Sequence, residues 1–508
     1  MSWCDRLRQE MLWMIVAMAL VGCNAVVWGQ SRSMNYIRVV EAKSASKSAP
    51  PAFGDISDVK VIYYDGLGRE IETVDVFASP NGYDIARFTE YDRTMEYRNL
   101  PSREYLPVET AYGDGQFVGV SGIIDYAEEQ YGDSRPYTET IYESNATARP
   151  VSVRGPGEAW RSHPVDMVYS FNSLSGPYSC LLFKLNADEE LENCGTYPAN
   201  RLKVTRTVNE DDNESYVFTD KRGRTVLERR VVAESIYADT YYAYDVYGDL
   251  RYMISPEGAA RITTVGVCDK TVLADYCYQY RYDERHRLIE RKLPGCEAEY
   301  FVYDKMDRIV YSQNGDDRVK SSWASVKYDD KGRKAIEGLT KINNPEKMGE
   351  AGRKWLQSQC GRRLVTETAE PERDADGALF YTNTEPYGTF SPRIAYFYDD
   401  YSHWYRAAWS DDLPFDTQDY PADSCLLDAT GLLTGTAVAN NGQVWITATI
   451  YDRDRNPIVE VSQEYGEGYT YYTLTARDFR GLPLRVKHKL YYFDSKSKPP
   501  ISDETQYV

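Results

Sequence analysis

The most regular feature of the chain is an alternation of apolar and polar positions that stops at a tyrosine–aspartate pair and then resumes. In the segment YRYDERHRLIERKLPG, residues 280–295, Tyr280 and Tyr282 lie two positions apart, and the strand-like run LIERKLP follows. Side chains two positions apart on a strand share one face of a sheet. The pattern therefore predicts a β-hairpin that presents tyrosine rings on one face.

The same unit recurs along the chain at a nearly constant period. Asp220 and Asp245 are 25 residues apart, and Asp283 and Asp304 are 21 apart. A lone hairpin is marginally stable in water, so such units are expected to stack edge to edge into one long sheet. Clear copies occupy residues 63–74, 218–228, 242–258, 280–295, 301–315 and 326–339, and weaker copies occupy 396–400, 449–461 and 475–486.

The residues between the two strands predict the turn. The aspartate can accept hydrogen bonds from backbone N–H groups two residues on. Three residues later comes a position that needs a positive φ, filled by glycine or, in two copies, by His286 or Asp307. Both residue types are enriched in the left-handed region. The predicted turn residues are Asp65, Gly68, Arg69, Asp220, Gly223, Arg224, Asp245, Gly248, Asp283, His286, Asp304, Asp307, Asp329, Gly332 and Arg333.

Two stretches break the strand pattern. Residues 344–361 carry an N-cap, a first-turn proline, an apolar face and a closing glycine, and residues 123–131 end at Gly132. We therefore expect at most two short helices in a β-dominated protein. The expected organisation is a flexible leader at 30–57, a β-rich N-terminal domain at 58–215 and a repeat region at 216–508 with the helical insertion near 344–361.

The composition of the chain limits the classes of molecule that are expected to bind it. The chain has 45 tyrosines, which suit half-buried sheet surfaces, and a net charge of −19. Such a polyanion repels nucleic acid and anionic lipid, so neither is an expected partner. Charged residues are interspersed and the apolar fraction is 42%, which favours a folded body.

Residues 1–29 have the pattern of an export signal, which places the protein at the cell surface, in the outer membrane or outside the cell. Two processing sites compete: a lipobox that would make Cys23 a lipid anchor, and an ordinary cleavage site after Gly29. Membrane association is expected only through that anchor. Export permits disulfides, and the sequence spacing favours the pairs Cys180–Cys194 and Cys268–Cys277.

The sequence carries little that points to catalysis or to a cofactor. The chain has 4 histidines, none within a hydrolase or metal motif. Its paired carboxylates are typical of solvent-exposed surfaces. A weak calcium candidate, Asp374 and Asp376, echoes the start of an EF-hand loop, but position twelve is Asn383. We therefore expect a protein without enzymatic activity, cofactor or bound metal. Exposed tyrosines offer a second possibility, the stacking of glycans.

The recurring Y-x-Y-D-x-x-G-R motif over residues 216–508 resembles the YD-repeat, or Rhs (rearrangement hotspot), family and its teneurin relatives. The segment from Tyr64 to about residue 160 is similar to a domain of unknown function that follows the signal peptide in many secreted Rhs-type proteins. The resemblance implies a β-shell that encloses a C-terminal toxin or effector. The sequence stops at SDETQYV, and we recognise in it no Rhs core with its autocleavage aspartates and no variable C-terminal domain. We therefore expect a truncated or split reading frame, or one component of a multi-chain system.

Two functions follow as expectations. The first is a structural shell or stalk segment of an exported Rhs-type system for toxin delivery. The alternative is a glycan-binding or adhesin module at the cell surface. The final hairpin is expected to leave a strand edge unpaired, so a protein partner or a continuation of the array is expected beside it.

Overall fold

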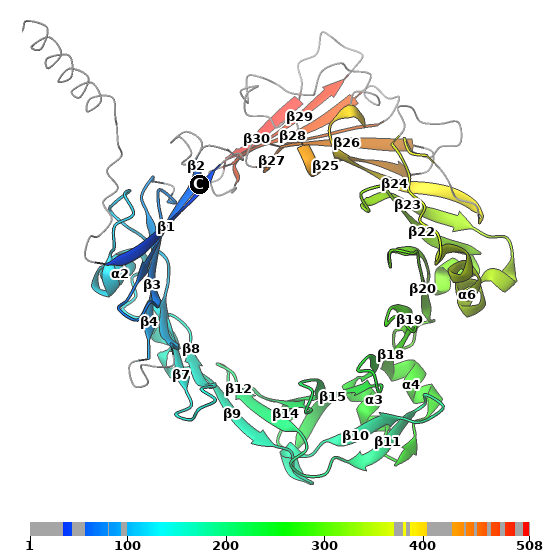
Figure 1. Cartoon of the computed structure of the whole chain (residues 1–508), viewed down its shortest axis with the longest axis horizontal. Coiled ribbons are helices and arrows are strands. Elements are labelled where there is room, and N and C mark those ends of the chain that lie inside the picture. Colours follow the sequence, from blue (N-terminus) through cyan, green and yellow to red (C-terminus); the bar gives the residue numbers. More distant parts are fainter. Residues whose placement is uncertain are drawn as a thin grey trace, which may run out of the picture. The chain divides into compact units, whose positions relative to one another are not determined.

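The computed structural model describes residues 34–42, 56–79, 81–92, 99–369, 379–382, 387–403, 429–440, 443–451, 455–464, 469–477, 483–492 and 501–506. Over these residues the protein consists mainly of antiparallel β-strands, so the predicted all-β hairpin array is confirmed. Packing divides the chain into an N-terminal unit, Met1–Asp166, and a C-terminal unit, Met167–Val508. Figure 1 labels the strands and helices and colours them along the sequence. The expected boundary at residue 216 rests on where the repeats become regular, and it stays a prediction.

In the N-terminal unit, neighbouring strands pair in antiparallel register. The pairs are β1–β2, β2–β3, β3–β4, β4–β5, β4–β6, β5–β7 and β7–β8. Val61, Tyr63 and Val74 form a fully buried core with Ile123 of the helix α2. The elements are β1 (Asn35–Ala42), β2 (Ile56–Tyr64), β3 (Glu70–Asp75), β4 (Ile85–Tyr91), β5 (Pro101–Tyr105), β6 (Val108–Glu109), α2 (Gly119–Tyr131), β7 (Tyr137–Tyr142), β8 (Pro150–Arg154), the 3₁₀ turn η3 (Glu158–Ser162) and β9 (Val165–Phe171), in which the unit boundary falls.

The helix α2 begins against a buried acid of the sheet. The carboxylate of Glu72 accepts the N–H groups of Val118 at 2.7 Å and of Gly119 at 2.8 Å, which a helix N-terminus otherwise leaves without an acceptor. Burial raises the pKa of Glu72 to about 7, although both hydrogen bonds act in the opposite direction. The start of α2 is therefore set by tertiary contact rather than by a capping side chain of its own.

In the C-terminal unit, strands follow one another as hairpins. From β12 to β30 each strand pairs antiparallel with the next, except that β16 pairs directly with β18 because β17 joins β10 and β11 in a separate sheet. The strands are β10 (Leu181–Leu185), β11 (Leu191–Thr196), β12 (Lys203–Val208), β13 (Glu214–Thr219), β14 (Thr225–Ala233), β15 (Ile236–Tyr244), β16 (Leu250–Ile254), β17 (Gly266–Val267), β18 (Cys277–Tyr282), β19 (Leu288–Lys292), β20 (Glu299–Tyr303), β21 (Ile309–Gln313), β22 (Ser322–Tyr328), β23 (Lys334–Lys341), β24 (Thr389–Asp399), β25 (Ala429–Asn440), β26 (Gln443–Tyr451), β27 (Pro457–Glu464), β28 (Tyr469–Arg477), β29 (Pro483–Tyr492) and β30 (Ile501–Gln506).

The expectation of at most two short helices is wrong. Besides α2, the described residues contain α3 (Pro256–Arg261), α4 (Lys270–Tyr276), α5 (Gly315–Val319) and α6 (Gly349–Cys360), together with the 3₁₀ turns η4 (Gly176–Tyr178) and η5 (Pro345–Lys347). The three helices that we missed are short and begin at capping residues. Ser255 caps α3, Asp269 caps α4, and Asn314 forms a capping box with Asp317 at α5. The capping residues can be read in the sequence, but the segments after them are too short to show the apolar periodicity that identifies a helix.

The two expected disulfides are not formed in the structure, where Cys180, Cys194, Cys268 and Cys277 are all free thiols. Cys180 is buried in the core beside β10, whereas Cys194 of β11 is exposed, so the two side chains lie on different faces of their hairpin. Cys268 and Cys277 share one core cluster, and burial raises the pKa of both thiols. For Cys180 and Cys194, closeness in sequence did not decide pairing, because it carries no information on which face a side chain takes.

Several predicted features lie outside the described residues: the export signal at 1–29, Cys23, and the calcium candidates Asp374 and Asp376. In the part of the chain that the structure describes, none of the helices is long and apolar enough to cross a membrane.

Candidate functional site: the aspartate turns of the repeats

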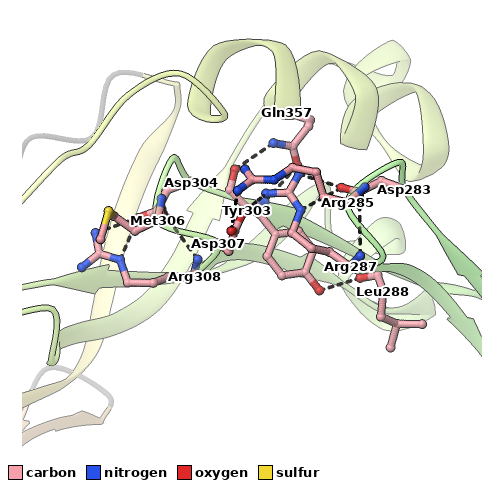
Figure 2. Close-up of polar contacts among 10 residues, drawn as sticks. All are labelled: Asp283, Arg285, Arg287, Leu288, Tyr303, Asp304, Met306, Asp307, Arg308 and Gln357. Carbon is pink, nitrogen blue, oxygen red and sulfur yellow. Dashed lines mark hydrogen bonds and ion pairs between the residues drawn. The ribbon is translucent and has the colours of Figure 1, made fainter. Parts of the chain in front are cut away.

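Each clear repeat closes on an aspartate whose side chain organises the turn. In the hairpin of β18 and β19, Oδ1 of Asp283 accepts the N–H of Arg285 at 2.9 Å and of Arg287 at 3.0 Å (Figure 2). The backbone closes the same loop, since the N–H of Asp283 donates to the carbonyl of Arg287 and the N–H of His286 donates to that of Asp283. The turn is thus held by side chain and backbone together, as the Asx geometry requires.

The other motif turns repeat these contacts. In each, the aspartate N–H donates to the carbonyl four residues on, and its own carbonyl accepts the N–H three residues on. Oδ1 also accepts the N–H of the fourth residue in every copy. These turns begin at Asp65, Asp220, Asp245, Asp304 and Asp329.

The fourth residue of the turn, counted from the aspartate as the first, is left-handed in every copy. His286 has a φ of 60° and Asp307 a φ of 61°, beside 77° at Gly68 and 82° at Gly332. Gly223 and Gly248 take φ of 82° and 105°. The residue before the aspartate marks a register shift, as at Val302/Tyr303, so the fifth loop residue is accommodated as a bulge.

The motif arginine makes two contacts that the sequence did not reveal. Nε of Arg287 donates to Oδ2 of Asp283 at 2.8 Å, and its guanidinium carbon lies 4.7 Å from the ring centre of Tyr303. Tyr303 precedes the aspartate of the next repeat, and its hydroxyl donates to the carbonyl of Leu288, next to the arginine, at 2.6 Å (Figure 2). One repeat therefore binds the motif tyrosine of the following repeat through both the ring and the hydroxyl.

This link between consecutive repeats recurs, and we call it the Asp–Arg–Tyr link. In each case the arginine pairs with its own aspartate, covers the next motif tyrosine at 4.2–4.7 Å, and that tyrosine donates to the carbonyl after the arginine. The members are Asp65–Arg69–Tyr91, Asp220–Arg224–Tyr244, Asp283–Arg287–Tyr303, Asp304–Arg308–Tyr328 and Asp329–Arg333–Tyr398.

In the link of Asp283, electrostatics keep the aspartate and Tyr303 in the protonation states that the link needs. Burial alone would raise the pKa of Asp283, but hydrogen bonds from Arg287 and Arg285 bring it below its ordinary value. Burial raises the pKa of Tyr303, so its hydroxyl stays a donor. A charged aspartate and a neutral tyrosine are the states in which an arginine can bridge the two.

A second carboxylate reinforces two of the links. Asp307 accepts from Arg285 at 2.6 Å and from Arg287 at 2.7 Å, which ties the loop of one repeat to the loop of the one before it. Asp399 accepts both Nη groups of Arg333 and also Lys331. The hydrogen bond from Arg333, ahead of all other causes, lowers the pKa of Asp399.

The helical insertion docks on the same part of the array. The side-chain amide of Gln357 in α6 accepts the N–H of Tyr303 at 3.0 Å and donates to its carbonyl at 2.8 Å (Figure 2). It thereby makes the two hydrogen bonds that a neighbouring strand would make. Described pairing between β19 and β20 covers only Glu290↔Tyr300 and Arg291↔Glu299, so Gln357 satisfies backbone groups beyond the end of that ladder.

Sequence reasoning missed two further turns of this type because asparagine replaces aspartate in them. Oδ1 of Asn186 accepts the N–H groups of Asp188 and Glu190, and Oδ1 of Asn209 accepts those of Asp211 and Asn213. Glu189 and Asp212 take the left-handed position with φ of 60° each. A motif that allows Asn at the first position of the turn and a non-glycine residue at the fourth position matches both turns.

The polar groups of the links are engaged in contacts within the array. In the five complete links the motif carboxylate binds backbone N–H groups and an arginine, and the tyrosine hydroxyl donates a hydrogen bond to a backbone carbonyl. A general acid or base needs a titrating group that can reach a substrate. In these five links the predicted turn aspartate is therefore brought together with its arginine, and the pair connects one hairpin to the next.

Comparison with known proteins gives one domain match. Residues 38–171 match the family described as Domain of unknown function (DUF6443), which covers part of the N-terminal half of the chain. No curated protein matches the chain.

Solved structures give distant likenesses. The crystal structure of TcdB2–TccC3 matches at 14% identity and a TM-score of 0.37, over 94% of this chain and 23% of that chain. The Photorhabdus luminescens Tc holotoxin pore matches at 14% identity and a TM-score of 0.35, over 85% of this chain and 20% of that chain. This chain thus spans about a fifth of the length of those proteins.

Proposed function

We propose that this chain is a non-enzymatic structural segment, a shell or stalk, of an exported Rhs-type system. The observation that carries the proposal is the Asp–Arg–Tyr link, which at five of the described turns joins one repeat to the next by a salt bridge, a cation–π contact and a hydrogen bond, as at Asp283. The link has a structural role, because it adds specific side-chain contacts between repeats to the backbone hydrogen bonds that pair their strands. The DUF6443 match at 38–171 agrees with an Rhs-type relative.

Each link stabilises the array by contacts that a sheet edge alone does not provide. A cation over a tyrosine face contributes about 0.5–1 kcal/mol at exposed sites and more when desolvated. A charge-assisted hydrogen bond contributes about 1.5–3 kcal/mol. Repeated along an array in which neighbours support each other, such terms favour one long cooperative sheet over separate hairpins.

Export to the cell surface and association with a protein partner belong to the same proposal. The export pattern at residues 1–29 supports export. Association with a partner is supported by the series of hairpins, in which one hairpin pairs with the next along the sheet. A partner that continues the array would supply the next motif tyrosine or strand. We extend the proposal to toxin delivery by the Rhs-type system of which this chain would be a segment.

The alternative, a glycan-binding surface made by the tyrosine ladder, is less well supported. In the complete links one face of the motif tyrosine is covered by an arginine, as for Tyr303 and Tyr328, and the hydroxyl is already bonded. A sugar that stacks on such a ring would have only the face opposite the arginine to stack on.

The decisive experiment combines the gene with the protein. The coding sequence beyond codon 508 and the adjacent reading frames are sequenced, and the tagged chain is expressed with them and purified. An in-frame continuation with further YD copies, or a neighbouring repeat protein that co-purifies at fixed stoichiometry, supports the structural role. A chain that stays a monodisperse monomer in light scattering, with no such partner, and that binds neutral glycans on an array overturns it.

A further inference from the structure

The N-terminal unit contains a cavity of about 530 Å³ that is lined mainly by guanidinium groups, which we call the arginine basin. Arg103 of β5, Arg135 before β7, Arg154 of β8 and Arg161 of η3 converge on it. The rest of the wall consists of Ser134, Tyr137, Glu139 and Glu158. A wall of four arginines and two glutamates is an unusual feature in a chain whose net charge is −19.

Arg135 is held in place by the backbone around it. Its Nη1 donates to the carbonyl groups of Gly155 and Gly157, and its own N–H donates to Oδ1 of Asp133 at 2.8 Å. The guanidinium lies 4.8 Å from the ring centre of Tyr137, and the residue is only 4% exposed. The group is therefore fixed before any ligand arrives, which lowers the entropic cost of binding.

One donor of Arg135 is left over. Within the described residues its buried Nη2 has no hydrogen-bond acceptor, and Oε2 of Glu139 lies 3.9 Å away, beyond hydrogen-bond distance. A buried donor without an acceptor costs about 1–3 kcal/mol. An acceptor on a ligand in the basin would remove that cost.

The neighbouring arginines are only partly neutralised by the wall. Glu139 is shared by Arg103 at 3.1 Å, by Arg154 at 3.5 Å and by Arg135, while Arg161 pairs with Glu158 at 3.0 Å. Arg103 also pairs at 3.5 Å with Glu90, which does not line the basin. Asp133 also stands nearby, but its oxygens already accept backbone N–H groups of Arg135 and Glu158. Guanidinium donors thus outnumber the acceptors available on the wall.

The mixed wall defines the chemistry of the ligand. Guanidinium forks match the geometry of a carboxylate, and they would bind phosphate as well. Glu139 and Glu158 repel a dianion more strongly than a monoanion, and their oxygens can accept from hydroxyl groups. A cavity of this volume suits a ligand of the size of one or two sugar rings.

We propose that the arginine basin is a binding site for a hydroxylated carboxylate, the chemistry that a uronic acid presents. The carboxylate accepts from Nη2 of Arg135, which has no hydrogen-bond acceptor within the described residues, and from Arg154 and Arg161, while the ligand hydroxyls donate to Glu139 and Glu158. The site is separate from the aspartate turns, so it gives the N-terminal unit a recognition role in addition to the scaffold.

Saturation-transfer NMR on the purified full chain tests the site with methyl glucuronide, methyl glucoside and inorganic phosphate as probes. We expect the glucuronide to bind, the neutral glucoside to bind far more weakly, and added salt to weaken the glucuronide signal. Equal binding of glucoside and glucuronide, or no glucuronide binding at millimolar concentration, overturns the proposal. Preferential binding of phosphate overturns the assignment to a carboxylate.

Variants at the rim separate binding from folding. Arg154→Gln and Arg161→Gln alter side chains that are 27% and 71% exposed, so both variants should fold. Each should weaken glucuronide binding about tenfold or more, the loss expected for a charge-assisted hydrogen bond. Arg87→Gln, which breaks a pair with Asp75 and does not line the basin, is the matched control and should bind as wild type. Undiminished binding by the Arg154→Gln/Arg161→Gln double variant overturns the proposal.

Discussion

Two turns of the C-terminal unit have the same backbone but different fourth and fifth residues. The turn at Asp304 holds Asp307 in the left-handed position and closes on Arg308, whose guanidinium lies 4.2 Å from the ring centre of Tyr328. The turn at Asp245 holds Gly248 there and closes on Asp249, so the arginine of the Asp–Arg–Tyr link is absent. Both turns keep the same backbone hydrogen bonds.

The Asp245 turn connects to the next repeat by other means. Asp249 accepts from Nδ1 of His286 at 2.7 Å, and Nε of Arg251 donates to the carbonyl of Tyr280 at 3.1 Å. His286 and Tyr280 both belong to the following hairpin. The comparison separates two roles within one motif: the aspartate and the left-handed residue make the turn, and the fifth residue makes the connection to the next repeat.

The largest effect is expected from removing the aspartate of a complete link. Asp304 is 3% exposed, and Asp304→Ala leaves Arg308 without its ion pair and the turn N–H groups without their acceptor. Breaking a buried pair from one side costs about 3 kcal/mol or more. Urea denaturation measures the loss, and Asp330→Ala, at an exposed aspartate of the next turn, is the control that should stay within about 0.5 kcal/mol.

The left-handed position should come next. Gly68 has a φ of 77°, where a β-branched residue is strained, whereas Gly66 in the same loop lies outside that region, and both have open space around them. Gly68→Val should therefore cost about 1–3 kcal/mol, and Gly66→Val little. Gly332→Val, at a φ of 82°, should cost about 1 kcal/mol or more for the same reason. Equal urea midpoints for the two valine variants at 66 and 68 would contradict the turn geometry.

Loss of the connecting arginine should have a smaller effect. Arg224→Gln keeps the turn at Asp220 but removes the ion pair and the cation over Tyr244, which together should cost about 1–2 kcal/mol. Lys221→Gln, at an exposed position of the same loop, is the matched control. Thermal denaturation of the two variants compares them directly, and equal midpoints would show that the aspartate alone carries the repeat.

The smallest effect should depend on pH. The hydrogen bond to Asp249 raises the pKa of His286 above 6.5, so its stabilising contribution is present below pH 6.5 and is lost as the pH rises through the raised value. His286→Gly should destabilise the protein in acid and be neutral or slightly stabilising at pH 8, where only the turn geometry counts. Denaturation at both pH values measures this, and Asp249→Asn should abolish the difference.

Much of the repeat could be predicted from residue types alone. An aspartate that precedes a glycine, histidine or aspartate by three positions specifies a turn through local hydrogen bonding and the steric limits on φ. The alternation around it specifies two strands, and the recurrence of the unit specifies a stacked array, which the fold confirms. All these signals act within a few residues, where sequence distance and spatial distance agree.

The remaining features depended on which distant side chains meet. Nothing at Arg333 indicates that its guanidinium covers Tyr398, 65 positions later, and nothing at Gln357 indicates that its amide binds the backbone of Tyr303. The arginine basin likewise gathers residues from separate strands and a 3₁₀ turn. Local patterns determined the hairpins, because backbone sterics and hydrogen bonds act locally. Only the tertiary structure decided the links and the basin, because strand register and loop length bring their members together.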